Sequence, residues 1–196
     1  MKSIATIVEG DGEVEAFPIL LRRICEWLSP GVYCNVLQPI RVRRDRFLNR
    51  EEEFRRMLEL AALKTGDDGW IVVLLDADDD CPSELGSKIL ERAKQVVPHK
   101  YVSVVLPNRE YEAWFLASAI SLDSCRGFSF PDIPTAPEAI RGAKEWLSER
   151  NPGGRYREVT DQPAFSARMN LQLAFDNSRS FRKLCSDWEK GISNQM

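Results

Sequence analysis

An apolar run that ends in acid decides the fold: residues 70–80 read WIVVLLDADDD. Consecutive apolar residues without alternation are typical of a strand that is buried on both faces of a sheet. Four carboxyl groups follow within five residues, at Asp76, Asp78, Asp79 and Asp80. Like charges this close repel one another unless a cation, protons or solvent relieve them. The run therefore predicts a buried strand that delivers acidic groups to one edge of a sheet, where a divalent metal would relieve their repulsion.

A second apolar strand opens the chain and also ends in acid. Residues 3–8 are the predicted strand, and residues 9–13 read EGDGE. Apolar residues then recur at helical spacing from Val14 to Leu28, which predicts a helix with one buried face. In open α/β sheets, ligands lie beyond the carboxyl ends of the strands. We therefore expect Glu9 and the aspartates after residue 75 to be neighbours.

Strand and helix signals alternate through the first two-thirds of the chain. Further strands are predicted at 32–40 and 101–106, and further helices at 51–64, from 82 to about 97, and at 108–119. Repeated strand–helix–strand units with apolar strands favour a mostly parallel sheet with helices on both faces. The prediction is an α/β, Rossmann-like core over residues 1–120.

The rest of the chain, residues 121–196, lacks the strand rhythm. A Pro-rich, irregular segment at 128–137 comes first, and helices are predicted near 137–149, 163–175 and 178–190. The Asn151-Pro-Gly-Gly turn separates the first two of these helices. We expect this part to be a helical extension packed on the core, not an independent domain.

Composition narrows the class of protein. The chain has 196 residues, of which 43% are hydrophobic, enough for one globular domain with a sizeable core. Its net charge is only -3, so a strongly basic nucleic-acid-binding surface would have to be local. The five cysteines are widely spaced and lack a CxxC pair, which argues against disulfides or structural zinc. With no signal-peptide pattern and no apolar run of membrane-spanning length, we expect a reduced, cytoplasmic protein without a membrane segment.

The acidic strand ends suit a magnesium site. Mg²⁺ prefers oxygen ligands and keeps several waters, so two or three carboxylates from different strand ends are enough to hold it. A metal held in this way lowers the pKa of bound water and stabilises the leaving oxygen of a phosphodiester. Glu9 lies where the first strand should end, so it would be either a ligand or a general acid or base.

One concentrated basic stretch could contact phosphates. We expect it to bind nucleic acid through Arg41, Arg43, Arg44 and Arg46. The alternative is a solvated, salt-bridged helix face, because Asp45 and the acids at 51–53 interleave with the arginines.

For some of these acidic residues, stabilisation of a helix N-terminus is the alternative to metal binding. Asp79 or Asp80 would cap the helix that opens at Pro82, and Glu13 would complement a helix dipole.

The acidic motifs resemble a known family. Val8-Glu9-Gly10-x-x-Glu13 after the first strand, with Asp76-x-Asp78 after a later one, resembles the TOPRIM domain of topoisomerases, primases and OLD-type nucleases. The chain is most similar to small stand-alone bacterial TOPRIM-like proteins, whose later blocks look like residues 110–114, EYEAW, and residues 180–184, SFRKL. It departs from the usual pattern at Asp80-Cys81-Pro82-Ser83, where a glycine often follows the acidic pair.

The resemblance implies a Mg²⁺-dependent nuclease, with Mn²⁺ as a substitute, that cleaves phosphodiester bonds. It implies Glu9 as general acid or base and Asp76 and Asp78 as metal ligands. Glu13 is a further catalytic candidate, and the further metal ligands would be Glu9 itself, Asp80 and Glu112. Some relatives are thought to accompany ATPases in bacterial defence or toxin-like systems, which implies an effector role. A non-catalytic metal- or phosphate-binding partner of an ATPase stays open, as does a phosphotransfer enzyme with an aspartate nucleophile.

Overall fold

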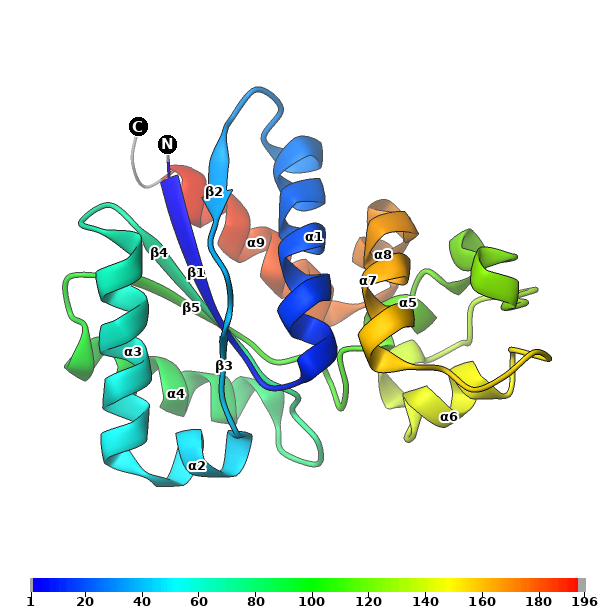
Figure 1. Ribbon diagram of the computed structural model, residues 1–196, viewed down its shortest axis with the longest axis horizontal. Helices are drawn as coiled ribbons and strands as arrows, with labels where there is room; N and C mark the ends of the chain where they lie inside the picture. Colours follow the sequence, from blue (N-terminus) through cyan, green and yellow to red (C-terminus); the bar gives the residue numbers. More distant parts are fainter. Residues whose placement is uncertain (1, 194–196) are drawn as a thin grey trace.

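A parallel β-sheet lies at the centre of the molecule in the computed structural model, which describes residues 2–193 (Figure 1). Within these residues the sheet has five strands in the order β2-β1-β4-β5, with β3 pairing with β1 beyond the end of β2. Every strand pair is parallel, so the predicted α/β, Rossmann-like fold is confirmed. The strands are β1 (Lys2–Val8), β2 (Cys34–Val36), β3 (Ile40–Arg41), β4 (Trp70–Leu74) and β5 (Tyr101–Val105).

Helices cover both faces of the sheet because the central strands are apolar on both sides. Every residue of β4 is buried. On one face, β4 packs with α3 (Glu51–Thr65) and α4 (Pro82–Val96) through Ile71 and Val73. On the other, Trp70 and Val72 join a larger apolar cluster with α1 (Asp11–Leu28) and α9 (Arg179–Ser193). Alternate residues of one strand thus serve two cores, as the uninterrupted apolar run predicts.

The strand predicted at 32–40 is split in two. Its first part, β2, pairs with the start of β1 (Ile4 opposite Val36), and β3 pairs with the end of β1 (Val8 opposite Arg41). Pro39 lies between them and has no N–H to donate to the ladder, so pairing is interrupted there. The basic stretch that follows forms a short helix that the sequence analysis did not predict, α2 (Arg44–Asn49).

The helix predicted at 108–119 is much shorter than expected. Only α5 (Ala113–Leu116) is α-helical, followed by the 3₁₀ helix η1 (Ala119–Leu122). Arg109 adopts a left-handed backbone conformation with φ 71°, and the Tyr111 N–H donates to the Asp76 carboxylate at 2.8 Å. The segment bends around Asp76, so regular helix begins only after the bend.

The remaining chain is mostly helical, and it packs on the rest of the molecule through α7 against α1 and through α9 against α1 and β5. It contains α6 (Ala143–Ser148), α7 (Glu158–Arg168), α8 (Leu171–Asn177) and α9, with short 3₁₀ helices η2 (Cys125–Gly127) and η3 (Pro137–Ala139). The helix predicted at 137–149 is shortened because Gly142 takes a left-handed conformation, φ 67°. The helix predicted at 163–175 is two helices, and the Asn170 side chain caps the second by accepting the Leu173 N–H at 3.0 Å. The last predicted helix is confirmed as α9.

Two further observations bear on the sequence predictions. All five cysteines lie in the described part of the chain and are free thiols, as expected. In residues 2–193 we find no helix with both the length and the apolar character needed to cross a membrane.

Candidate functional site

The ends of three neighbouring strands bring carboxyl groups together. Glu9 follows β1, Asp76 follows β4, and Glu112 follows β5 after the bend described above. Burial raises the pKa of Asp76 well above its ordinary value, and the charges of Glu13, Glu112 and Glu9 raise it further. Glu9, Glu13, Asp76 and Glu112, called the acidic cluster below, are therefore neighbours at the carboxyl edge of the sheet. The strand pattern predicted this for Glu9 and Asp76.

Asp76 is held in place by the backbone of the next strand–helix connection. Its Oδ1 accepts the Tyr111 N–H at 2.8 Å. The Tyr111 ring is fully buried, and its hydroxyl lies 3.0 Å from the hydroxyl of Ser166 on α7. Asp76 thus cannot turn away from the cluster without loss of this partly buried hydrogen bond.

Glu112 is the most enclosed acid of the cluster, with 1% of its surface exposed. Its Oε1 accepts a hydrogen bond from Gln162 Nε2 at 3.3 Å. Its Oε2 is buried and has no partner in the part of the chain that the structure describes. Burial raises the pKa of Glu112 to about 7. An uncompensated buried carboxylate is costly, so this oxygen calls for a ligand, a water or a proton.

Glu9 has a similar unpaired oxygen. Its Oε2 is buried without a hydrogen-bond partner among the described residues. Burial raises its pKa, and the charges of Glu13 and Asp78 add to the effect while Arg44 and Lys144 oppose it. Two carboxylate oxygens from different strand ends therefore lack partners in the same acidic cluster.

Glu13 has a clear structural role. Its Oε2 accepts the N–H groups of Gly10 at 2.6 Å and Glu9 at 3.1 Å, at the N-terminus of α1. A carboxylate at the third helical position caps the helix in this way and complements its dipole. The expected dipole role of Glu13 is thus present, and its assignment as a catalytic residue stays a prediction.

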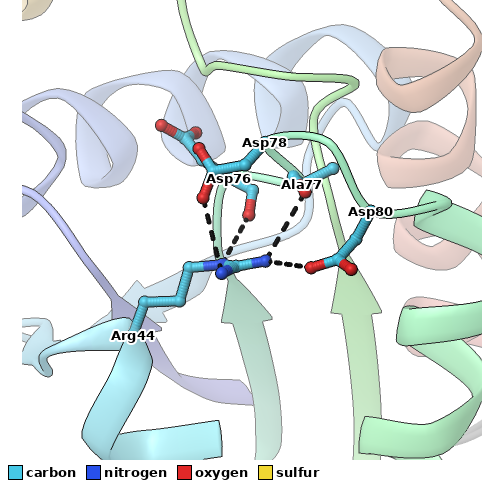
Figure 2. A network of polar contacts seen from close by, with 5 residues as sticks. All are labelled: Arg44, Asp76, Ala77, Asp78 and Asp80. Atoms are coloured by element: carbon cyan, nitrogen blue, oxygen red, sulfur yellow. Dashed lines mark hydrogen bonds and ion pairs between the residues drawn. The ribbon is translucent and has the colours of Figure 1, made fainter.

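Asp78, Asp79 and Asp80 pair with arginines, and the charge of Asp78 still acts on Glu9. Arg44 is only 19% exposed, and its Nη2 contacts Asp80 Oδ2 at 2.6 Å while its Nη1 lies 3.4 Å from Asp78 Oδ2. The same guanidinium donates to the backbone carbonyls of Asp76 at 3.1 Å and Ala77 at 3.5 Å (Figure 2). Asp78 itself has a left-handed backbone, φ 52°. Arg44 therefore stabilises the acidic turn, residues 76–80, through contacts with both its backbone and its side chains.

Asp79 is paired by two other arginines. Arg109 and Arg141 each approach its Oδ1 at 2.8 Å and lower its pKa. The alternative that Asp79 or Asp80 caps the following helix is wrong, because Cys81 occupies the N-cap of α4 and no side chain caps it in the described structure.

The predicted nucleic-acid-binding arginines differ in their surroundings. Arg44 is engaged by the acidic turn, and Arg41 forms an ion pair with Asp11 at 2.8 Å. Arg43 is mostly exposed, with Asp45 3.9 Å away, and Arg46 is half-buried on α2. Their binding of nucleic acid stays a prediction, and Arg43 and Arg46 are the members least engaged by other side chains.

A lysine that no sequence motif indicated lies beside the acidic cluster. Lys144, on α6, forms an ion pair with Glu158 at 2.8 Å. Burial alone would lower its pKa, but the charges of Glu112, Glu158 and Asp76 outweigh burial and raise it. The neighbouring Gln162 and Tyr156 also line this region, and Gln162 Oε1 and Tyr156 Oη are buried without partners among the described residues. No motif singles out these residues, because only the packing of α6 and α7 brings them to the strand ends.

The carboxylates of the acidic cluster suit Mg²⁺ in their chemistry, but too few lie close together to surround the ion. Across residues 2–193, no three acidic, histidine or cysteine side chains stand close enough to bind one metal ion between them. Mg²⁺ commonly uses only one or two carboxylates and completes its shell with water and substrate oxygens. A pair formed by the Asp76 carboxylate and the unpaired oxygen of either Glu9 or Glu112 fits that kind of open site.

Comparisons with known proteins identify a family but no activity. No curated protein and no solved structure matches the chain. A family model described as "Domain of unknown function (DUF4276)" matches residues 8–189, a range that includes the acidic cluster, Lys144 and most of α9. The chain therefore belongs to the DUF4276 family.

Proposed function

We propose that this protein is a Mg²⁺-dependent hydrolase that cleaves phosphodiester bonds of nucleic acid at the acidic cluster. The observation that supports this most is the pair of buried, unpartnered oxygens, Glu9 Oε2 and Glu112 Oε2, in a cluster at the carboxyl edge of a parallel sheet. Several buried carboxylates with raised pKa values are costly to a fold, and such groups concentrate at functional sites.

Asp76 and one of its neighbours Glu9 and Glu112 would hold the cation, and the other carboxylate would lie beside it. Water and substrate oxygens would supply the remaining ligands. When bound, Mg²⁺ would neutralise charge on the phosphoryl group and favour ionisation of an attacking water. Asp76 is fixed by the Tyr111 N–H, so one ligand oxygen is preorganised. The ligand roles of Asp78 and Asp80 stay predictions. In this proposal their pairing with Arg44 supports the turn that presents Asp76.

In this proposal Glu9 would transfer a proton and Lys144 would contact the phosphate of the substrate. Glu9 is half-buried and burial raises its pKa, which favours a role for this carboxyl group in proton transfer. The Lys144 ammonium faces the same carboxylates and would contact a phosphate oxygen of the substrate. Nucleic acid would approach over α2, where Arg43 and Arg46 are available.

The test is calorimetric titration with Mg²⁺ and Mn²⁺ of the wild type and of Glu9→Gln, Asp76→Asn and Glu112→Gln. The same samples are assayed for cleavage of single- and double-stranded DNA and RNA. Asp79→Asn is the matched control, because Asp79 belongs to the same turn but pairs with Arg109 and Arg141. We expect the three variants to lose metal affinity at least ~10-fold, as removal of a buried ligand implies, and to lose cleavage, while the control retains both.

Two outcomes contradict the proposal. A wild type that binds neither metal would remove the cation site altogether. Metal binding without cleavage of any substrate would favour the non-catalytic module, a partner of an ATPase that senses metal or phosphate.

A further inference from the structure

A cavity separate from the acidic cluster lies between α4 and α9. Its volume is about 530 Å³, within the range of about 300–1,000 Å³ that is usual for small-molecule sites. No member of the acidic cluster lines it. The lining residues that matter below come from α4 (Ser83, Gly86, Ser87, Leu90), from β5 and the segment after it (Val104, Leu106, Asn108), and from α9 (Arg179, Lys183).

The cavity combines an apolar floor with polar walls. Val104 and Leu106 are almost fully buried and form the floor with Leu90. Ser83 and Ser87 are four residues apart on α4, so their hydroxyls share one face of that helix. A ligand that fills this space needs both an apolar body and groups that can form hydrogen bonds.

The wall formed by α9 is cationic. Arg179 and Lys183 are four residues apart on that helix and therefore also share a face. Lys183 pairs with Asp187, and its ammonium lies 3.4 Å from the Val104 carbonyl. The Arg179 guanidinium has no ion pair or side-chain hydrogen bond to any residue in the described range. The Arg179 guanidinium could therefore form an ion pair with a ligand in the cavity.

Glu138 also lines the cavity, but its carboxylate is already fully engaged. It accepts the N–H groups of Arg179 and Ser180, each at 2.9 Å, and the hydroxyl of Ser178 at 2.8 Å. The Glu138 carboxylate therefore stabilises the start of α9. The Arg179 guanidinium is the group on this wall that could bind an anion.

Gly86 keeps the cavity open. It lies in the middle of α4, where glycine destabilises a helix by about 1 kcal/mol relative to alanine. A Cβ at Gly86 would meet only Leu106 Cδ1, at 3.8 Å, which is an ordinary contact. Packing therefore does not require glycine here. A larger side chain at this position would extend into the cavity, and glycine leaves that space free.

We propose that this cavity binds a nucleoside phosphate, with the phosphate at Arg179 and Lys183 and the base over Leu90, Val104 and Leu106. The serine hydroxyls and Asn108 would meet the ribose or the base edge. A phosphorylated sugar would leave the apolar floor unused, and an acyl phosphate would leave the polar walls unused. The site does not depend on the hydrolase proposed above, because it shares no residue with the acidic cluster.

Calorimetry in EDTA tests the proposal with the full-length chain and the four common nucleoside monophosphates as probes. We expect at least one of them to bind, and the matching nucleoside and inorganic phosphate to bind at least ~10-fold more weakly, as loss of a charge-assisted contact implies. Gly86→Phe should abolish binding by filling the cavity, whereas Gly86→Ala should retain it. Arg179→Gln should weaken binding ~10-fold or more.

Controls separate the cavity from the rest of the surface and from the hydrolase proposal. Lys190→Gln removes a charge from the same helix, away from the cavity lining, and should not change the affinity. Asp76→Asn should bind the nucleotide normally even if it abolishes metal binding. The melting temperature of Gly86→Phe should be at or above that of the wild type, because the change removes a helical glycine. Failure of all four probes to bind, or wild-type affinity in Gly86→Phe, would overturn the proposal.

Discussion

At the scale of single residues, Glu112 links stability to pH. Its pKa is about 7 in the folded protein and about 4.3 in an unfolded chain. Between these values the folded state holds a proton that the unfolded state has released. Metal-free stability should therefore fall as pH rises from about 4.3 to 7, and remain lower above that window.

Glu112→Gln should remove the part of this dependence that Glu112 contributes, because glutamine keeps the shape of the side chain without its charge. Asp76 and Glu9, whose pKa values are also raised, should keep theirs. At pH 8 without metal, the variant should be more stable than the wild type by about 3–4 kcal/mol, and at pH 4.5 the two should be nearly equal. Urea unfolding in EDTA from pH 4.5 to 8 measures the difference. Glu149→Gln, at a largely exposed carboxyl, is the control and should follow the wild type at every pH. A constant offset between Glu112→Gln and wild type across the range would contradict this account.

Arg44 shows how one cation can shape an acidic turn. It bonds to two backbone carbonyls and two carboxylates of the turn, whose residue Asp78 has an unfavourable left-handed backbone. Arg44→Gln should destabilise the protein by about 1–3 kcal/mol, since charge-assisted hydrogen bonds in a half-buried setting are lost. Arg43→Gln, at a side chain that is 68% exposed, should cost less than about 0.5 kcal/mol. Urea unfolding measures both changes in the free energy of unfolding. Equal losses in the two variants would mean that Arg44 does not stabilise the turn.

At the scale of elements, the close approach of α1 and α7 places Gln162 against the acidic cluster. A Cβ at Gly12, in the first turn of α1, would lie 2.0 Å from Gln162 Oε1 and 3.0 Å from the Glu158 carbonyl oxygen. Only glycine lets the two helices come this close. Gln162 would have to move and give up its hydrogen bond to Glu112.

Gly12→Ala and Gly86→Ala are the same chemical change in two helices and should have opposite effects. Gly12→Ala should destabilise the protein by about 1–3 kcal/mol, because overpacking displaces α7. Gly86→Ala should stabilise it by up to about 1 kcal/mol, because its site is open and alanine favours helix. Thermal unfolding of both variants tests this. Stabilisation by Gly12→Ala would show that α7 is not tightly packed against α1.

Elements with strong periodicity were predictable from sequence, and those set by distant contacts were not. The apolar runs and helical spacing located the strands of the described chain, with β2 and β3 predicted as one, and most of its longer helices. The bend at Arg109 depends on Asp76, which lies more than thirty residues earlier, so local patterns predicted a helix there. Glu9 and Asp76 were predictable because strand ends meet at one edge. Lys144 and Gln162 were not, since their positions follow from how α6 and α7 pack.

At the scale of the whole molecule, residues after 120 contribute to both candidate sites. They supply Lys144 and Gln162 beside the acidic cluster, and Arg179 and Lys183 at the cavity. The same apolar cluster also joins both parts of the chain: Trp188 on α9 packs against Trp70 on β4 with ring centroids 5.5 Å apart. The helical part and the sheet should therefore not be separable in stability.

Trp188→Ala tests this coupling. Loss of a fully buried tryptophan should destabilise the protein by about 3–5 kcal/mol. The whole molecule should then unfold in one transition at a lower urea concentration, because the space left by the Trp188 side chain would adjoin both β4 and α9. Far-ultraviolet circular dichroism and tryptophan fluorescence should give coincident curves in wild type and variant. Leu63→Ala, at a side chain that is 81% exposed, is the control and should leave the midpoint nearly unchanged. Two separate transitions, with the later one at the wild-type midpoint, would show that the sheet is stable without α9 and that the two parts unfold independently.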